Sequence, residues 1–248
     1  QEFRSGQAPA TKGFGQWLMK FDGVTGNKDK EIADPQGFGR IEYAYYLMAK
    51  AAGVEMNECR LHEEGGRAHF MTKRFDRTQD GDKLHMQSFG AMMHYDFNVA
   101  GAYAYEQALQ TIRRLRLSRS DMEQQVRRAY LNILARNQDD HVKNIAFLMN
   151  RKGEWRLSPA FDVAYSYNPT GDWTSQHQMS LAGKRDDFSI DDLIDFAGVG
   201  DVKKTRAKSI LSEVSQAVAD WKSFARKADI PDSDIDRIIK THRRELFV

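Results

Sequence analysis

The sequence predicts an α+β fold with a small sheet-containing N-terminal lobe over residues 1–82 and a larger, mostly helical C-terminal lobe over residues 83–248. Two observations predict it. Strand, helix and hairpin patterns fill the first 80 or so residues, and beyond Asp82 apolar residues recur mainly at helical spacing. A length of 248 residues permits one large domain or two modest ones, so the division rests on this change of pattern.

The first lobe begins with a predicted strand. In residues 15–21, GQWLMKF, apolar side chains alternate at Trp17, Met19 and Phe21. Residues 58–77, ECRLHEEGGRAHFMTKRFDR, read as a hairpin because two adjacent glycines supply the positive backbone dihedrals of a tight turn.

A helix is predicted between these strands, over residues 39–53, GRIEYAYYLMAKAAG. Ile41, Tyr45 and Met48 recur at helical spacing, and Gly53 can end the helix.

The second lobe is predicted to open with helices at residues 85–94, 103–115 and 118–137. Ser120 and Glu123 have the spacing of a capping box, which favours a helix start there.

An isolated strand pair, IAFLMN (residues 145–150) and EWRLS (residues 154–158), follows and is joined by RKG as a turn. Beyond Ser189 the pattern is helical to the end, with interruptions near Gly198 and Pro231.

Composition excludes several classes of protein. Lys and Arg total 37 against 35 Asp and Glu, so we expect no direct nucleic-acid binding. No apolar run approaches the roughly 20 residues that span a bilayer, and no membrane association is expected. Cys59 is the single cysteine, which suits the reducing cytoplasm. The chain starts at Gln1 rather than at a methionine, so we expect it to be part of a longer protein.

The segment NQDDHVKN, residues 137–144, carries the most chemistry. In phosphoryl-transfer enzymes of the protein-kinase type, a carboxylate accepts the proton of the acceptor hydroxyl and an amide five residues later binds magnesium. Asp139 and Asn144 have this separation. A solvated turn is the alternative, because acidic residues and asparagine are common in loops.

Asp162, after the strand pair, could reach the same cleft. Mg²⁺ usually takes one or two carboxylates together with phosphate oxygens. Pro159, Phe161 and Val163 indicate an ordered, partly buried segment around it. A carboxylate that only tightens a turn is the alternative.

Lys20 lies within the apolar strand, where an ammonium must reach solvent or pair with an anion. A phosphate would suit it, and Glu42 on the following helix is the candidate to orient it. The alternative is an exposed lysine at a sheet edge.

His141 could be a metal ligand, a phosphate donor or a structural hydrogen-bonding group. A zinc site is disfavoured because no Cys or His cluster lies nearby. Residues 175–188, SQHQMSLAGKRDDF, read as strand and turn, and we assign them no role.

Five segments in order, WLMKF, IEYAYYLMAKAAG, MTKRFDR, NQDDHVKN and WRLSPAFDVAYS, resemble the HipA family of bacterial serine/threonine kinases, the toxins of HipBA-type toxin–antitoxin pairs. The resemblance runs through most of the chain and implies a two-lobed, protein-kinase-like fold that uses ATP and Mg²⁺. It also implies transfer of the γ-phosphate to a serine or threonine of a protein. Aminoacyl-tRNA synthetases or other translation components are the expected targets, and a HipB-like DNA-binding antitoxin is the expected partner.

By position, the resemblance implies Asp139 as the catalytic base, Asn144 and Asp162 as magnesium ligands, and Lys20, supported by Glu42, as the phosphate-binding lysine. It also implies that Lys73, Arg74 and Phe75 link the two lobes, with a backbone that holds the adenine. The remaining nucleotide-site residues that it implies are His141, Lys143 and Phe161.

Two substitutions depart from the family pattern. Asp140 stands where a small residue is common, and Phe161 where a tyrosine is common. We also do not identify the family's glycine-rich loop and regulatory serine in SGQAPATKG, residues 5–13.

Two other functions stay open from the sequence. The same site could phosphorylate a small molecule, because related kinase folds act on antibiotics and sugars. The chain could also be a nucleotide-binding or partner-binding module without catalysis.

Overall fold

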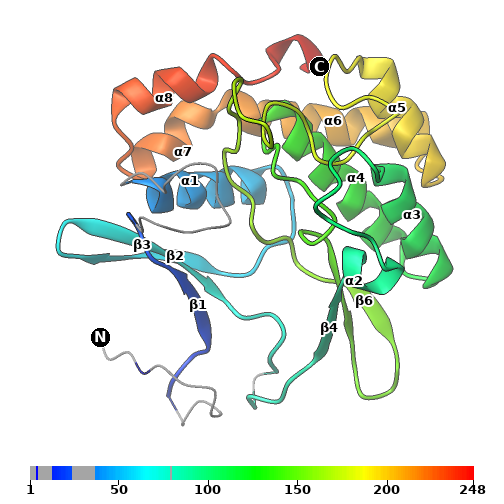
Figure 1. Cartoon of the computed structure of the whole chain (residues 1–248), viewed down its shortest axis with the longest axis horizontal. Coiled ribbons are helices and arrows are strands. Elements are labelled where there is room, and N and C mark those ends of the chain that lie inside the picture. Colours follow the sequence, from blue (N-terminus) through cyan, green and yellow to red (C-terminus); the bar gives the residue numbers. More distant parts are fainter. Residues whose placement is uncertain (1–3, 5–12, 24–36, 79) are drawn as a thin grey trace.

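The computed structural model describes residue 4 and residues 13–23, 37–78 and 80–248, and has an α+β fold (Figure 1). The glycine-rich segment sought in residues 5–13 lies almost wholly outside the described residues. Two small antiparallel sheets lie side by side below a layer of helices (Figure 1). No helix within the described ranges is long and apolar enough to cross a membrane.

The first sheet has the order β1-β3-β2, with β1 at Trp17–Lys20, β2 at Cys59–Glu64 and β3 at Arg67–Lys73. Gly65 and Gly66 form the predicted hairpin turn with φ of 57° and 77°. Strand β1 is half-buried in alternation, as its pattern predicts, but Phe21 follows the strand and is 62% exposed.

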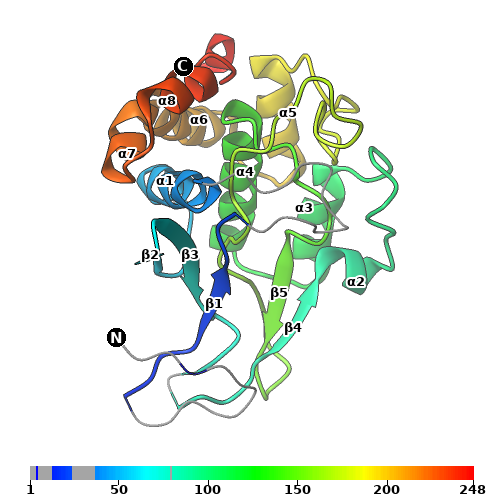
Figure 2. The same cartoon turned by 60° about the vertical axis from the view of Figure 1, so that its left-hand side comes forward.

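Helix α1, Phe38–Ala51, lies between this sheet and the C-terminal helices (Figure 2). Tyr45, Met48 and Ala49 are fully buried on its inner face. At Gly39 the helix meets β3 so closely that an added Cβ would lie 2.1 Å from the carbonyl oxygen of Ala68. Only glycine permits this approach.

The second sheet corrects one prediction. Residues 85–94 were predicted to be helical, but β4 occupies His85–Ser88 and a short helix, α2, follows at Phe89–Met93. Strand β4 pairs with β5, Ala146–Met149, which also pairs with β6, Trp155–Leu157. The pairing of β4 with β5 therefore overrides the local helical pattern of these residues. Helix α2 begins directly after β4, where Ser88 caps it by accepting a hydrogen bond from the backbone N–H of Ala91 at 3.1 Å.

The remaining helices surround α4. Their bounds are α3 Tyr105–Arg114, α4 Arg119–Leu134, α5 Ile190–Val199, α6 Lys204–Ala219, α7 Trp221–Lys227 and α8 Asp232–Ile239, with a 3₁₀ turn at Arg244–Leu246. One continuous cluster of buried apolar residues joins α1 to these helices. The lobe boundary near residue 82 remains a prediction.

The start of α4 corrects a second prediction. The capping box is formed by Ser118 and Asp121, whose side chain accepts from the Ser118 backbone N–H at 3.0 Å, and not by Ser120 and Glu123. Glu123 instead pairs with Arg119 and Arg206. Both spacings fit the motif, and the earlier pair lies where the chain leaves its extended conformation.

Candidate active site

Three charged side chains from distant parts of the sequence meet beside the end of β1. The ammonium of Lys20, at the end of β1, lies 2.7 Å from Oε1 of Glu42 on α1 and also donates a hydrogen bond to Oδ1 of Asp162. Glu42 is 2% exposed, so its carboxylate requires a partner, and Lys20 supplies one. Lys20 lies on an edge strand with 49% of its side chain exposed, as the alternative predicted, but its ammonium is paired with both carboxylates.

The charge of Lys20 is fixed by these partners. Burial would lower the pKa of its ammonium, but the charges of Glu42 and Asp162 outweigh burial and raise the pKa above its ordinary value. A permanent cation therefore lies beside Asp162.

The segment that carries Asp162 has a special backbone. Asp162 has φ of 56°, in the left-handed region that few residues other than glycine, asparagine and aspartate adopt. A parallel bridge between Met56 and Ala160, with the Ala160 N–H donating to Glu55 at 2.7 Å, fixes the preceding residues against the N-terminal part of the chain. Asp162 is held by its surroundings and does not lie in a free turn.

A cavity of about 290 Å³ opens beside Lys20 and brings together seven of the predicted nucleotide-site residues. They are Lys20, Glu42, Lys73, Arg74, Phe75, Phe161 and Asp162. The other lining residues are Leu18, Met56, Cys59, Phe70, Thr72, Asp76 and Met86. This combination of an apolar wall and charged groups at one end suits a ligand with an apolar ring and an anionic tail.

Arg74 is partly neutralised within that cavity. Its guanidinium binds both carboxylate oxygens of Asp76, at 2.8 and 2.6 Å, which raises the pKa of Arg74 through hydrogen bonding. The Phe75 and Phe161 rings lie 5.5 Å apart between their centroids. Phe75 therefore links the end of the first sheet to the segment that carries Asp162.

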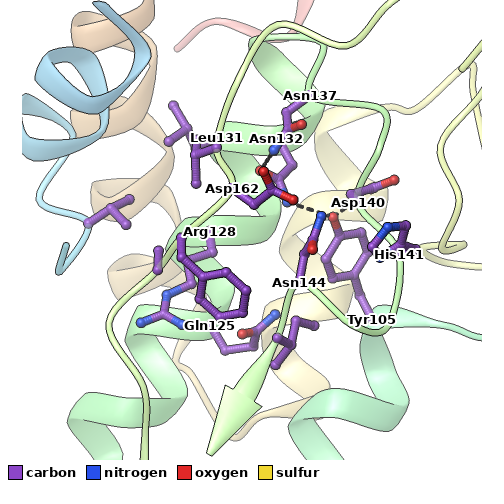
Figure 3. A pocket seen from close by; sticks show the side chains of 15 residues that line it. Tyr105, Gln125, Arg128, Leu131, Asn132, Asn137, Asp140, His141, Asn144 and Asp162 are labelled. Carbon is purple, nitrogen blue, oxygen red and sulfur yellow. Dashed lines mark hydrogen bonds between the residues drawn. The ribbon is translucent and has the colours of Figure 1, made fainter. Parts of the chain in front are cut away.

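A second, smaller cavity of about 30 Å³ lies behind Asp162 (Figure 3). Its lining includes His141, Asn144, Phe161 and Asp162, together with residues of α4. This volume holds about two water molecules. Both side-chain amide atoms of the fully buried Gln125 lack a hydrogen-bond partner in the described chain, which fits a hydrated cavity.

The loop from Asp139 to Asn144 closes on itself. The Asn144 side-chain N–H donates to the carbonyl of Asp139 at 2.8 Å, and the Asn144 backbone N–H donates to the carbonyl of His141 at 2.9 Å. The amide nitrogen is thereby committed, and Oδ1 of Asn144 is left as the atom that can bind a cation. The separation of five residues between Asp139 and Asn144 lets the side chain of Asn144 reach the carbonyl of Asp139 and close the turn.

The carboxylate of Asp139 lies in a mixed environment. Its Oδ1 accepts a hydrogen bond from the Trp173 indole N–H at 2.9 Å and lies 3.7 Å from Nε2 of His141. Burial raises the pKa of the Asp139 carboxyl, and the negative charges of Asp162 and Asp140 act in the same direction. His141 and Trp173 oppose them. Asp162 therefore acts on Asp139 through its charge, although Asp139 itself lines neither cavity.

His141 and Lys143 both pack on Phe97. The Lys143 ammonium lies 3.1 Å from the centroid of the Phe97 ring, and the His141 ring lies 5.8 Å from it. His141 lines the smaller cavity, whereas Lys143 lines neither cavity. A contact of Lys143 with nucleotide remains a prediction.

The sequence did not reveal the buried partners of Asp140. Its carboxylate, 3% exposed, accepts hydrogen bonds from the Tyr105 hydroxyl at 2.6 Å and the Gln178 N–H at 2.7 Å, and lies 2.6 Å from Nδ1 of His177. Burial opposes ionisation of Asp140, but His177 and these hydrogen bonds lower its pKa. The acid beside Asp139 and the polar run at residues 175–188 were visible signals, but no local pattern joins them.

The residues present fit a magnesium ion. No group of three or more His, Cys, Asp or Glu suited to a metal occurs in the described ranges. Magnesium needs fewer protein ligands, because it keeps waters and takes phosphate oxygens. Asn144 and Asp162 line the same cavity and offer an amide and a carboxylate oxygen of the type that it prefers.

Comparison with known proteins identifies a family and a fold. A sequence model of the HipA-like C-terminal domain matches residues 4–222. No curated protein matches the chain. The structure is similar to HipA from Shewanella oneidensis, solved in a complex with HipB and operator DNA, with a TM-score of 0.68 and 14% identity. The match covers 98% of this chain and 65% of that one, so this chain spans less than two thirds of it.

A second similar structure is the Helicobacter pylori proinflammatory kinase CtkA, with a TM-score of 0.55 and 12% identity. That match covers 94% of this chain and 89% of CtkA. The predicted kinase-like α+β fold is confirmed by both structures.

Proposed function

The chain belongs to the family of HipA-like C-terminal domains, and we propose that it forms the catalytic part of an ATP- and Mg²⁺-dependent serine/threonine protein kinase that acts as a toxin. One observation carries the proposal. Lys20, Glu42 and Asp162 converge beside the larger cavity, and Asp162 also lines the smaller cavity together with Asp140, His141 and Asn144 of the loop. A structural ion pair alone would not need a large, partly apolar cavity next to it.

In this proposal the chain works mainly by positioning and charge neutralisation. Lys20, oriented by Glu42, binds phosphate oxygens of ATP. Asn144 and Asp162 would hold magnesium, which neutralises charge on the transferring phosphate. Asp139 accepts the proton of the acceptor hydroxyl, and the burial that raises its pKa makes it a stronger base than an exposed carboxylate.

The apolar part of the larger cavity would receive the adenine ring. Lys73, the last residue of β3, lines this wall together with Arg74 and Phe75. The N–H groups of Lys73 and Arg74 already donate to the carbonyls of Glu58 and Gln16, so a backbone N–H for the base would come from Phe75. The contact between Phe75 and Phe161 would connect the base site to Asp162.

We further propose a protein substrate, of which an aminoacyl-tRNA synthetase or another translation component is an example, and a HipB-like DNA-binding antitoxin as partner. The Shewanella oneidensis HipA structure contains HipB and operator DNA, which supports the second suggestion. The cytoplasm is the setting that we propose.

The test is phosphoryl transfer by the wild-type chain and by Asp139→Asn, using Mg²⁺ and γ-labelled ATP with cell-extract proteins. Removal of the base should lower the transfer rate about 100-fold or more. Nucleotide affinity, measured by calorimetry, should change little because Asp139 binds no phosphate in this scheme.

The matched control is Asp82→Asn, since Asp82 is exposed and pairs only with Arg151 among the described residues. Full activity of Asp139→Asn would refute the role of Asp139. Labelled small molecules with no labelled protein would indicate a small-molecule kinase, and binding without any transfer would indicate a non-catalytic module.

A further inference from the structure

Trp173 makes a direct contact with the proposed catalytic base. Its indole N–H donates to Oδ1 of Asp139 at 2.9 Å, across 34 residues of sequence. The other oxygen, Oδ2, accepts no hydrogen bond from any residue that the structure describes. The bond therefore fixes the rotation of the carboxylate and leaves one oxygen for another donor.

The segment that carries Trp173 is tied to the loop that carries Asp139. The Gln178 side chain donates to the carbonyl of Trp173, and the Gln178 backbone N–H donates to Oδ1 of Asp140 at 2.7 Å. Gln138 also donates to the carbonyl of Thr174, at 3.4 Å. Trp173 is thus held at a set position relative to the loop.

A buried histidine adds a rigid anchor. Arginine has only donors, so the 2.9 Å contact between Arg243 and Nε2 of His177 requires that Nε2 accept the hydrogen bond. The ring proton then lies on Nδ1 and is donated to Oδ2 of Asp140 at 2.6 Å. His177 is fully buried, and Asp140 and Arg243 are 3% and 2% exposed, so the contact cannot swing into solvent.

We propose that Trp173 is a positioning residue for Asp139, an inference that rests on the proposed function. By holding Oδ1, the indole presents Oδ2 to the acceptor hydroxyl. In the step that this serves, the hydroxyl oxygen bonds to the γ-phosphorus, and the bond from that phosphorus to the bridging oxygen of ADP breaks. The hydroxyl proton passes to Asp139.

The decisive variant is Trp173→Phe, which keeps an aromatic ring and removes the donor. Loss of a hydrogen bond to a charged group should lower kcat about 10- to 100-fold, while KM for ATP and the affinity for Mg²⁺–nucleotide stay within about twofold. A general loss of structure would instead weaken nucleotide binding as well.

Trp155→Phe is the matched control. Trp155 lies on β6, packs against His85 and lines neither cavity, so the same substitution there should leave kcat unchanged.

A second readout does not depend on turnover. The indole ¹H–¹⁵N resonance of Trp173, assigned by through-bond triple-resonance experiments on the wild-type chain, should move upfield and exchange faster with solvent in Asp139→Ala. The indole resonances of Trp17, Trp155 and Trp221 should stay in place. An unmoved Trp173 resonance would overturn the inference, even if Trp173→Phe failed to fold.

The outcomes separate the two proposals. Absence of transfer by the wild-type chain overturns the proposed function, and this inference with it. If the wild-type chain transfers phosphate and Trp173→Phe keeps its full kcat, the inference is overturned but the proposed function is not.

Discussion

Glu42 shows how one residue can be assigned from a pattern and yet be understood only from its contacts. The sequence pairs a strand lysine with a helix carboxylate, and the structure places the two 2.7 Å apart. The helical spacing of α1 puts Glu42 on a buried face, where it is 2% exposed. Burial makes the pair specific, because a buried carboxylate without its cation is costly.

Glu42→Gln tests this interpretation at the scale of the residue. The amide keeps the shape of the side chain but removes the charge that orients Lys20, so Lys20 should pair with Asp162 alone. We expect the affinity for Mg²⁺–nucleotide, measured by calorimetry, to fall about tenfold, or about 1.4 kcal/mol. Glu64→Gln, at an exposed hairpin position, is the control. Equal affinities for all three proteins would contradict an orienting role.

Other residues of the candidate site could not be predicted because their partners are distant in sequence. No local spacing links Asp140 to Tyr105 or His177. The indole of Trp173 likewise reaches Asp139 only through the fold. Sequence patterns indicate side chains that share a helix face or a turn, whereas these contacts depend on how loops pack.

At the scale of elements, the predicted strand, helix and hairpin of the first lobe are confirmed, because alternation, helical spacing and paired glycines are local signals. A helix was predicted for residues 85–94, but the first four of these residues form strand β4. Strand β4 exists because β5 offers it a partner, with His85 opposite Met149 in the register. Pairing of this kind is not encoded in a short window of sequence.

The close contact between α1 and β3 at Gly39 leads to a prediction about the stability of the fold. In Gly39→Ala the new methyl group would meet the carbonyl oxygen of Ala68, so the helix must move away from the sheet. We expect the free energy of unfolding in urea to fall by about 1–3 kcal/mol.

Gly198→Ala is the matched control for Gly39→Ala. Gly198 lies in α5 with nothing within 4 Å of an added Cβ, so this change should stabilise the chain by up to about 1 kcal/mol. Equal effects of the two substitutions would show that close packing at Gly39 does not matter.

At the scale of the whole molecule, α1 belongs to the same buried cluster as the C-terminal helices. Tyr45 on α1 lies in the middle of this cluster. Its hydroxyl donates to the carbonyl of Ala135 at 2.6 Å and lies 3.2 Å from Nε2 of His242, while its ring packs edge-on against Trp221. The sequence predicted two lobes, but it did not predict that Tyr45 of α1 is held by Trp221 and His242 in the C-terminal part of the chain.

His242 makes the stability of this anchor dependent on pH. Burial, with the nearby charges of Arg136 and Arg244, lowers the pKa of His242 to about 3 from an ordinary value of 6.5. Between these two values the unfolded chain binds a proton that the folded chain does not. The free energy of unfolding should therefore fall with decreasing pH below 6.5, by about 1.4 kcal/mol per pH unit from this residue.

His242→Phe should remove that dependence. Phenylalanine keeps an aromatic ring against Tyr45 and Trp221, and the Tyr45 hydroxyl keeps Ala135 as its acceptor. Urea unfolding at pH 6.5 and 5.0 should show that the wild-type chain loses about 2 kcal/mol more than the variant over this interval. His94→Asn, at an exposed position, should leave the wild-type difference unchanged. If His242→Phe behaved like His94→Asn, the histidine would be protonated in the folded chain, and the anchor between α1 and the C-terminus would have to tolerate a buried charge.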